Sequence, residues 1–447
     1  MTNEKYGLIG KTLVHSYSKE IHEALGRYQY QLFSLAEDEM PDFINARDFR
    51  GLNVTIPYKK DVIPLCDEVT DLARGIGAVN TLFWKNASGT GASENISQED
   101  KILVGHNTDY EGFLYAASRA GIDFEGKGVL ILGTGGTSLM ARRAAADQNA
   151  AKIYIASRHP ETDPPSGSEI QDAGILSTVS YDQLSEIAAS IDVIVNTTPV
   201  GTFPNNMQQV IRLKDFPGCQ AVIDVIYNPF KTALLLEAEK LGLKYTNGLP
   251  MLVAQATAAA GYFLGTPGAF QKENQRIIKA MKQQMGNIVL IGMPGTGKSI
   301  IGKLLAELTG KTLQDTDAKI EEEAEMTIPE IFEKEGEAGF RDRESAICKK
   351  LGKERNLIIA TGGGAILRPE NVAALRQNGT LVHITRSIDK LPTRGRPLSK
   401  NIEALKKMEA QRMPLYKAAA DITFRNNYTC SRKKLRERVN TYILEKL

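Results

Sequence analysis

Short runs of apolar residues alternate along the chain with segments in which apolar residues recur every three or four positions. The runs have strand length and contain many β-branched residues, as in 128–133 (GVLILG) and 287–292 (NIVLIG). In the segment 300–308, the isoleucines and leucines fall on one face at 3.6 residues per turn, which predicts a helix. Strands that alternate with helices indicate an α/β protein with mostly parallel sheets.

The length of 447 residues suits two to four domains. Residues 266–286 carry apolar residues at helical spacing and are interpreted as the last helix of a first part. The stretch 287–447 then has the size of one domain.

Charge and cysteine content exclude several classes of protein. The 55 basic and 53 acidic residues give a net charge of +2, without the basic excess typical of partners of nucleic acid or anionic membranes. The four cysteines lie far apart in the sequence without a CxxC motif, which is typical of reduced thiols in a reducing compartment. The first residues are charged where a signal peptide is apolar, and no apolar run is long enough for a membrane span. We therefore expect a cytoplasmic protein with no nucleic-acid or membrane partner; an oligomer is possible.

The stretch GMPGTGKS (292–299) fits the phosphate-loop pattern GxxxxGK[ST] between a predicted strand and a predicted helix. Backbone N–H groups of such a loop and the positive end of the helix bind phosphate oxygens. Lys298 is expected to reach the outer phosphates of ATP, and the Ser299 hydroxyl is expected at Mg²⁺. The expected nucleotide contacts are Gly292, Gly295, Thr296, Gly297, Lys298, Ser299 and Ile300.

Acidic, basic and glycine-rich motifs follow in the order DTD (315–317), GEAGFRDRE (336–344), TGGGA (361–365), RGRPL (394–398) and QRMPLY (411–416). Phosphoryl transfer depends on positioning and charge neutralisation, so cations should gather near the transferred group. Asp315 is predicted to support Mg²⁺, and Asp317 is predicted to accept a hydrogen bond from a substrate hydroxyl. One such arginine alone would be typical of a solvated surface; the ordered set indicates a kinase with a small acceptor.

With these motifs, residues 287–447 resemble the shikimate kinases over essentially the whole domain. The resemblance implies that shikimate contacts Asp317, Arg341, Gly363, Gly364 and Arg412, with both arginines on its carboxylate. It also implies that Arg396, in a lid, acts in catalysis together with Lys298, and that Arg394 lies on the adenine side. The segment RSIDKLPTRGRPL (386–398) is shorter and less basic than expected for such a lid.

The first part contains an imperfect dinucleotide fingerprint in GVLILGTGGTS (128–138), where Ser138 stands in place of the third glycine. The next predicted strand ends in Ser157-Arg158, where an NAD-binding fold would have an acidic residue. An anion-binding pair at this point suits a 2′-phosphate, so NADP(H) is favoured. The expected contacts here are Gly133, Gly135, Gly136, Thr137, Ser157 and Arg158.

Polar residues also gather in HSYS (15–18), NVTIPYKK (53–60), GAVNTL (77–82) and GHNTDYEGF (105–113). Each stretch alone would be typical of a turn or a helix cap. Together with NTTPVG (196–201), DVIYNP (224–229) and GLPMLVAQA (248–256), they make residues 1–285 resemble the shikimate dehydrogenases over their full length.

This second resemblance implies a substrate-binding and catalytic domain made of 1–105 with 235–285, an NADP-binding Rossmann domain of 106–234, and the P-loop kinase domain of 287–447. It implies that shikimate contacts Ser16, Ser18, Thr55, Asn80, Asp109 and Gln255, with Lys59 and Asp109 as the catalytic pair. Tyr227 and Gly248 would lie at the border of substrate and nicotinamide, and the dinucleotide groove would be lined by Asn196, Thr197 and Thr198. Pro250 stands where this family commonly has a second glycine.

The predicted function is NADPH-dependent reduction of 3-dehydroshikimate to shikimate, followed by ATP-dependent phosphorylation to shikimate 3-phosphate. Three alternatives remain. The first part could prefer quinate with NAD, against which Arg158 argues. The second could be another small-molecule kinase, such as a nucleotide kinase, against which the DTD and arginine motifs argue. One part could be a non-catalytic regulatory module, although all candidate catalytic residues are present.

Overall fold

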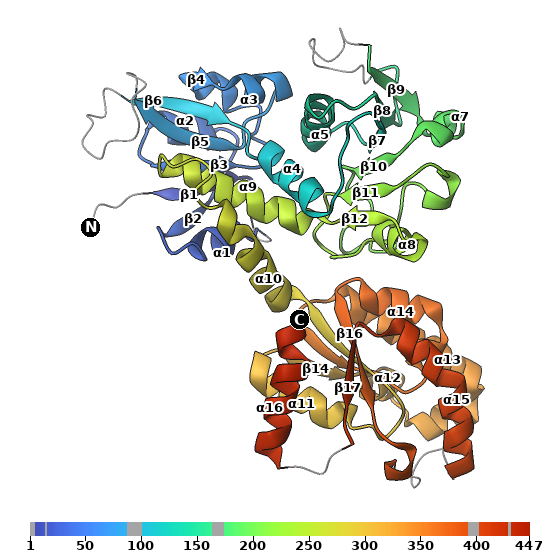
Figure 1. Ribbon diagram of the computed structural model, residues 1–447. Helices are drawn as coiled ribbons and strands as arrows, with labels where there is room; N and C mark the ends of the chain where they lie inside the picture. The colour runs from blue at the N-terminus through green and yellow to red at the C-terminus, as the bar shows by residue number, and fades with distance from the viewer. Residues whose placement is uncertain (1–4, 14–15, 87–100, 163–173, 392–401, 428–430) are drawn as a thin grey trace. The chain divides into compact units, whose positions relative to one another are not determined.

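The computed structural model describes residues 5–13, 16–86, 101–162, 174–391, 402–427 and 431–447. It divides into two compact units (Figure 1). Unit 1 consists of Met1–Thr202 and Gln208–Ala280, and unit 2 consists of Met281–Leu447 with Phe203–Met207. In the described part of the chain, no helix combines the length and the hydropathy that crossing a membrane requires.

The first sheet of unit 1 has the strand order β2-β1-β3-β5-β6-β4. Its strands are β1 (Tyr6–Gly10), β2 (Tyr30–Ser34), β3 (Gly51–Val54), β4 (Glu68–Val69), β5 (Thr81–Asn86) and β6 (Lys101–His106). The pairs of β5 with β3 and with β6 are antiparallel, and the other pairs are parallel. The short helices of this region are α1 (Ser18–Glu23), α2 (Glu39–Asn45) and α3 (Asp71–Ile76).

Helix α9 (Gly248–Phe263) returns to this first sheet from much later in the chain. Its Tyr262 ring packs on Phe83 of β5, and its Phe263 ring fills the space beside Gly51 of β3. Figure 1 shows α9 next to α4 (Asp109–Arg119). The first sheet is therefore covered by a helix from the other end of unit 1.

The second sheet of unit 1 is entirely parallel and has the order β12-β11-β10-β7-β8-β9. Its strands are β7 (Gly128–Leu132), β8 (Lys152–Ser157), β9 (Leu176–Ser180), β10 (Val193–Asn196), β11 (Ala221–Asp224) and β12 (Lys244–Thr246). The helices α5 (Gly136–Asp147), α7 (Leu184–Ile187) and α8 (Ala233–Leu241) belong to this layer. The strand order reverses between β7 and β10, and ligands of such sheets bind at the carboxyl ends beside that point.

One predicted boundary differs from the structure. The resemblance predicts that 235–246 belongs to the substrate-binding domain, but α8 packs its leucines into the core of the second sheet and β12 pairs with β11. The chain returns to the first sheet only with α9. Apolar periodicity shows that a helix is buried but not which sheet buries it. The predicted return of the chain to the first sheet, at residue 235, is therefore about a dozen residues too early.

Unit 2 has one parallel sheet with the order β14-β15-β13-β16-β17. Its strands are β13 (Asn287–Ile291), β14 (Thr312–Asp315), β15 (Leu357–Ala360), β16 (Gly379–Thr385) and β17 (Ile422–Arg425). Helix α10 (Asn274–Met285) leads into β13 and is followed along the chain by α11 (Lys298–Thr309), α12 (Thr316–Ala324), α13 (Ile328–Lys353), α14 (Pro369–Arg376), α15 (Ile402–Ala419) and α16 (Arg432–Tyr442). Two apolar cores cover the two faces of the sheet. The predicted fold class, α/β with two sheets followed by a parallel P-loop sheet, is confirmed.

Candidate active sites

A cavity of about 380 Å³ in unit 1 is lined by elements of both of its sheets. It brings together predicted residues that are scattered along the sequence: Ser16, Ser18, Thr55, Lys59, Asn80, Asp109, Thr137, Tyr227, Gly248 and Gln255. Asn53, which is not among the predicted site residues, also lines this cavity. The signal in the sequence is its place in NVT, two residues before Thr55, because residues two apart along an extended segment share a face.

Lys59 and Asp109 form an ion pair inside this cavity. The Lys59 Nζ donates to Asp109 Oδ2 at 2.5 Å, and the two side chains are 25% and 17% exposed. Lys59 lies in the loop after β3, and Asp109 is the first residue of α4. A lysine ammonium held this way can also donate to an oxygen that gains negative charge.

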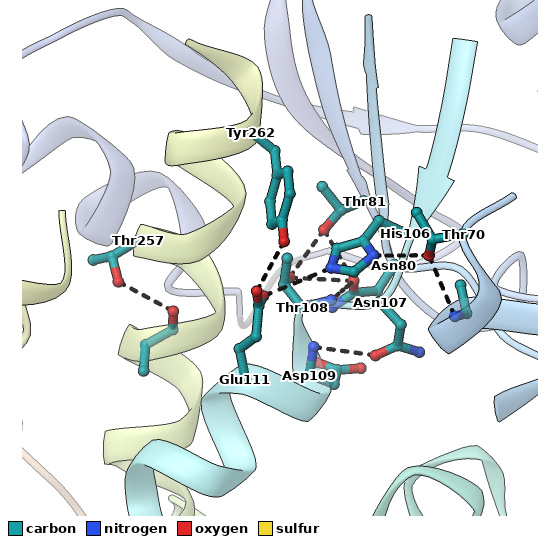
Figure 2. A network of polar contacts seen from close by, with 12 residues as sticks. Thr70, Asn80, Thr81, His106, Asn107, Thr108, Asp109, Glu111, Thr257 and Tyr262 are labelled. Atoms are coloured by element: carbon teal, nitrogen blue, oxygen red, sulfur yellow. Dashed lines mark hydrogen bonds and ion pairs between the residues drawn. The ribbon is translucent and has the colours of Figure 1, made fainter. Parts of the chain in front are cut away.

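The orientation of Asn80 is set by its neighbours (Figure 2). Its Oδ1 accepts from the Thr108 backbone N–H at 2.8 Å, from Thr81 Oγ1 at 2.9 Å and from Thr108 Oγ1 at 3.2 Å. A backbone N–H must point at an oxygen, so the amide cannot be turned round. The Asn80 NH₂ group is therefore the end that remains to donate to a ligand.

A polar cluster next to this site supports the first turn of α4 (Figure 2). His106 Nδ1 lies 2.8 Å from Thr70 Oγ1, and its Nε2 faces Glu111 Oε2 at 3.8 Å. The Tyr262 hydroxyl donates to Glu111 Oε1 at 2.9 Å, and burial raises the pKa of this tyrosine above its ordinary value. Because Glu111 lies two residues after Asp109, these contacts restrain the turn that carries the Asp109 carboxylate.

The residues predicted to bind a dinucleotide lie at the carboxyl ends of β7, β8 and β10. Gly133 has a φ of +100°, and a Cβ there would lie 3.0 Å from Thr198 Cγ2. A Cβ on Gly135 or Gly136 would meet nothing within 4 Å, so this loop leaves room beside the start of α5 for a phosphate. Arg158 is exposed at the end of β8, next to the buried Ser157. These residues fit NADP(H).

The side chains of Asn196 and Thr197 hold the backbone at the end of β10, beside the loop that carries Gly133. Asn196 is buried; its Nδ2 donates to Asp224 Oδ1 at 3.1 Å, and its Oδ1 accepts from both the N–H and the hydroxyl of Thr198. The Thr197 hydroxyl donates to the Leu132 carbonyl at 2.7 Å. Burial raises the pKa of Asp224 to about 6. The amide of Asn196 thus holds the turn that presents Thr198.

The start of α9 explains two further positions. A Cβ on Gly248 would lie 1.9 Å from the Val225 carbonyl oxygen, so only glycine fits there. Pro250 is the third residue of α9, and the Asn247 side chain caps the helix by accepting from Leu249 N–H at 3.1 Å. N–H groups in a first helical turn have no partner within the helix, so the proline removes no helical hydrogen bond.

A second cavity, of about 640 Å³, lies in unit 2. It brings together these predicted residues: Gly295, Gly297, Lys298, Ser299, Ile300, Asp315, Asp317, Arg341, Gly363, Gly364 and Arg412. Gly292 and Thr296 shape the loop itself; the Thr296 hydroxyl donates to the Met293 carbonyl at 2.9 Å. The predicted lid residues Arg394 and Arg396 lie outside the described residues.

At one end of this cavity, the Lys298 ammonium donates to the Gly292 carbonyl at 2.8 Å and so lies over the phosphate loop. The Ser299 hydroxyl donates to Asp315 Oδ2 at 3.2 Å, and Asp315 Oδ1 accepts from Asp317 N–H at 3.0 Å. A hydroxyl and a carboxylate beside a phosphate loop are the oxygen ligands that Mg²⁺ takes in such sites. The residues therefore fit Mg²⁺ together with a nucleotide.

Asp317 differs from Asp315 in its surroundings. Its Oδ1 is buried without a hydrogen-bond partner among the described residues. Burial, together with the charges of Asp315 and Glu344, raises the pKa of Asp317 to about 6. A carboxylate with this pKa and a free oxygen in a cavity can accept a proton near neutral pH.

The other end of the cavity carries two arginines. Arg341 donates to Glu344 Oε2 at 2.7 Å, and a Cβ on Gly364 would lie 2.1 Å from Arg341 Nη1. Arg412 Nη1 donates to the Gly363 carbonyl at 2.9 Å. Glu344 is fully buried, and burial raises its pKa although Arg341 opposes this. Its role in holding Arg341 was missed, although its i+3 spacing in RDRE was a visible signal.

Known proteins resemble the two units separately. A family model described as shikimate dehydrogenase substrate binding domain matches residues 8–82, and one described as shikimate kinase matches residues 294–447. A shikimate dehydrogenase (NADP(+)) of Caldicellulosiruptor bescii is 35% identical over 268 residues, which are 57% of this chain and 88% of the relative. A shikimate kinase of Nitrosomonas europaea is 48% identical over 145 residues, which are 31% of this chain and 69% of the relative.

The solved structures agree for unit 1. A chorismate mutase/shikimate 5-dehydrogenase fusion protein from Clostridium acetobutylicum is similar with a TM-score of 0.54 and 32% identity. The similarity covers 63% of this chain and 98% of that one.

Proposed function

The chain belongs to the shikimate dehydrogenase family in its N-terminal part and to the shikimate kinase family in its C-terminal part, and from this we propose how its two cavities act. The protein is a bifunctional enzyme with shikimate dehydrogenase (NADP⁺) and shikimate kinase activities. Unit 1 reduces 3-dehydroshikimate to shikimate, and unit 2 phosphorylates shikimate to shikimate 3-phosphate. The hydroxyl that the first reaction creates is the acceptor of the second.

In unit 1, bound NADPH supplies the hydride. Negative charge grows on the ketone oxygen of the substrate, and Lys59 donates a hydrogen bond and a proton to that oxygen. Asp109, 2.5 Å from Lys59, accepts a hydrogen bond from the ammonium and orients it. The Asn80 NH₂ group donates to a substrate hydroxyl, with Ser16, Ser18, Thr55 and Gln255 around the ring. General acid catalysis of this kind contributes roughly 10²–10⁴-fold.

In unit 2, bound Mg·ATP supplies the phosphoryl group. Asp317 accepts the proton of the attacking hydroxyl, since its pKa of about 6 leaves it mostly ionised at neutral pH. Arg341 and Arg412 hold the carboxylate of shikimate, and Lys298 neutralises charge on the transferred phosphoryl group. The catalytic role of Arg396 stays a prediction, because this residue lies outside the described residues.

The proposal is carried by one observation: each unit gathers the sequence-predicted residues for one reaction into one cavity. The test supplies 3-dehydroshikimate, NADPH and Mg·ATP to the full chain and follows both NADPH loss and shikimate 3-phosphate. Lys298→Ala should stop formation of shikimate 3-phosphate but not NADPH loss. Lys59→Ala should stop both, and added shikimate should restore phosphorylation in that variant. A protein that consumes neither cosubstrate would refute the proposal.

The same assay separates the alternatives. Supplying quinate with NAD⁺ tests whether unit 1 prefers that substrate and cofactor. Arg158, exposed at the end of β8, argues that NADP⁺ is preferred. Nucleoside monophosphates, supplied as phosphoryl acceptors in place of shikimate, test whether unit 2 is a nucleotide kinase. A unit that binds its ligand without turnover would be the regulatory module of the third.

A further inference from the structure

Arg386 lies directly after β16, and its side chain lines the cavity of unit 2. Strand β16 runs parallel to β13, the strand that enters the phosphate loop, with His383 paired to Ile291. A Cβ on Gly292 would lie 2.4 Å from the Ile384 carbonyl oxygen, so the end of β16 passes against the first residue of the loop. Arg386 therefore follows a strand end that is packed on the phosphate loop.

Hydrogen bonds hold the backbone on both sides of Arg386. The Asn426 N–H donates to the Thr385 carbonyl at 2.7 Å, and the Ser387 N–H donates to Asn427 Oδ1 at 2.7 Å. The side chain of the same Asn426 donates to the Thr296 carbonyl, inside the phosphate loop, also at 2.7 Å. Asn426 thus connects the turn that carries Arg386 to the loop that binds phosphate, so their separation is fixed.

The charge of Arg386 has no counterpart within the described residues. Its Nε is buried without an acceptor, and no carboxylate among those residues forms an ion pair with it. By contrast, Arg341 in the same cavity is paired with Glu344 and Glu337. Buried donors of a cation are normally satisfied, so an unpaired guanidinium in a cavity indicates an anionic ligand from outside the protein.

We propose that Arg386 is a further phosphate-binding residue of the kinase, whose guanidinium contacts the γ-phosphoryl group of ATP during transfer. The inference rests on the proposed kinase function. The acceptor end of the cavity already has Arg341 and Arg412 for one carboxylate, whereas Arg386 is tied to the phosphate loop through Asn426. Together with Lys298 it places two cations at the transferred group, and a guanidinium matches the spacing of phosphate oxygens.

The test compares Arg386→Gln, Arg386→Lys and the matched control Arg436→Gln, an exposed arginine on α16 of the same unit. Kinase rates are measured against ATP at saturating shikimate and against shikimate at saturating ATP. Loss of one charge-assisted hydrogen bond is worth on the order of tenfold or more. We therefore expect Arg386→Gln to lower kcat/KM for ATP by at least about tenfold, with KM for shikimate within about twofold of wild type. Arg386→Lys should recover part of the loss, and Arg436→Gln should match wild type.

Calorimetric binding of a non-hydrolysable ATP analogue and of shikimate completes the test. Weaker analogue binding with unchanged shikimate binding supports the proposal and shows that unit 2 is folded. Unchanged kcat/KM for ATP in Arg386→Gln overturns it, and so does a defect confined to KM for shikimate, which would place Arg386 on the acceptor. If wild type transfers no phosphoryl group to shikimate, the kinase assignment fails, while the analogue titration still decides whether Arg386 binds the phosphates.

Discussion

Replacing Asp317 with Asn should make unit 2 more stable while it stops phosphoryl transfer. The Asp317 carboxylate is buried in the cavity, and one of its oxygens has no partner among the described residues. Burial raises the pKa of Asp317 from 3.8 to about 6, which means that the folded protein holds this group less well ionised than the unfolded chain does. An amide of the same shape carries no charge and avoids that cost.

The size of the effect follows from the pKa. A rise of about two pH units corresponds to at most about 3 kcal/mol of unfolding free energy that the ionised carboxylate costs above pH 6. The sign is that of a carboxyl whose folded pKa is raised: the cost is fully present above about pH 6, shrinks as the pH falls, and is absent below about 3.8. The Asn variant should therefore gain roughly 1–3 kcal/mol at neutral pH and much less near pH 4.

Scanning calorimetry at about pH 7.5 and pH 4.5 measures this gain, with the transition of unit 2 identified as the one that ATP raises. For a unit of this size, 1 kcal/mol is worth about 2–4 °C. Kinase kcat/KM of the wild type should fall about tenfold per pH unit below 6, because the base must be ionised. A variant that is no more stable at pH 7.5, or one that gains equally at both pH values, would refute the idea that a buried charge is the cause.

Three further outcomes are expected. Lys59→Ala should lower kcat for reduction of 3-dehydroshikimate by roughly 10²–10⁴-fold with little change in KM, and the kinase rate of the same protein is its control; an unaffected kcat removes Lys59 from the mechanism. Arg158→Ala should raise KM for NADPH on the order of tenfold and leave KM for NADH unchanged, whereas an equal effect on both cofactors would contradict a 2′-phosphate contact. Tyr262→Phe removes the donor to Glu111 and should cost about 1 kcal/mol in urea unfolding; no loss would mean that the hydrogen bond contributes nothing to stability.

The parts of the fold that depend only on residues close together in the sequence could be predicted from local motifs. The phosphate loop is a single stretch between a strand and a helix, so its spacing in 292–299 predicts both its backbone and its chemistry. The Gly133 turn before α5 is of the same kind. The motifs around Lys59 and Asp109 are short and specific, and the fold brings these two side chains, 50 residues apart, into one hydrogen bond; their catalytic role stays a prediction.

The crossing between the two sheets of unit 1 shows where local pattern fails. Helix α8 and strand β12 have ordinary apolar periodicity, and only the pairing of β12 with β11 assigns them to the second sheet. Pairing is a contact between segments distant in sequence, and periodicity within one segment carries no information about its partner.

The chain by itself determined which residue types are available at each turn and strand end, because short-range geometry and chemical type are properties of the local sequence. The tertiary structure alone decided how those groups are oriented and charged: which end of Asn80 is left to donate, that Asp317 Oδ1 has no hydrogen-bond partner among the described residues, and that Arg386 follows a strand packed on the phosphate loop. These properties depend on which donors, acceptors and charges from distant segments surround a side chain, and that surrounding exists only once the sheets have assembled.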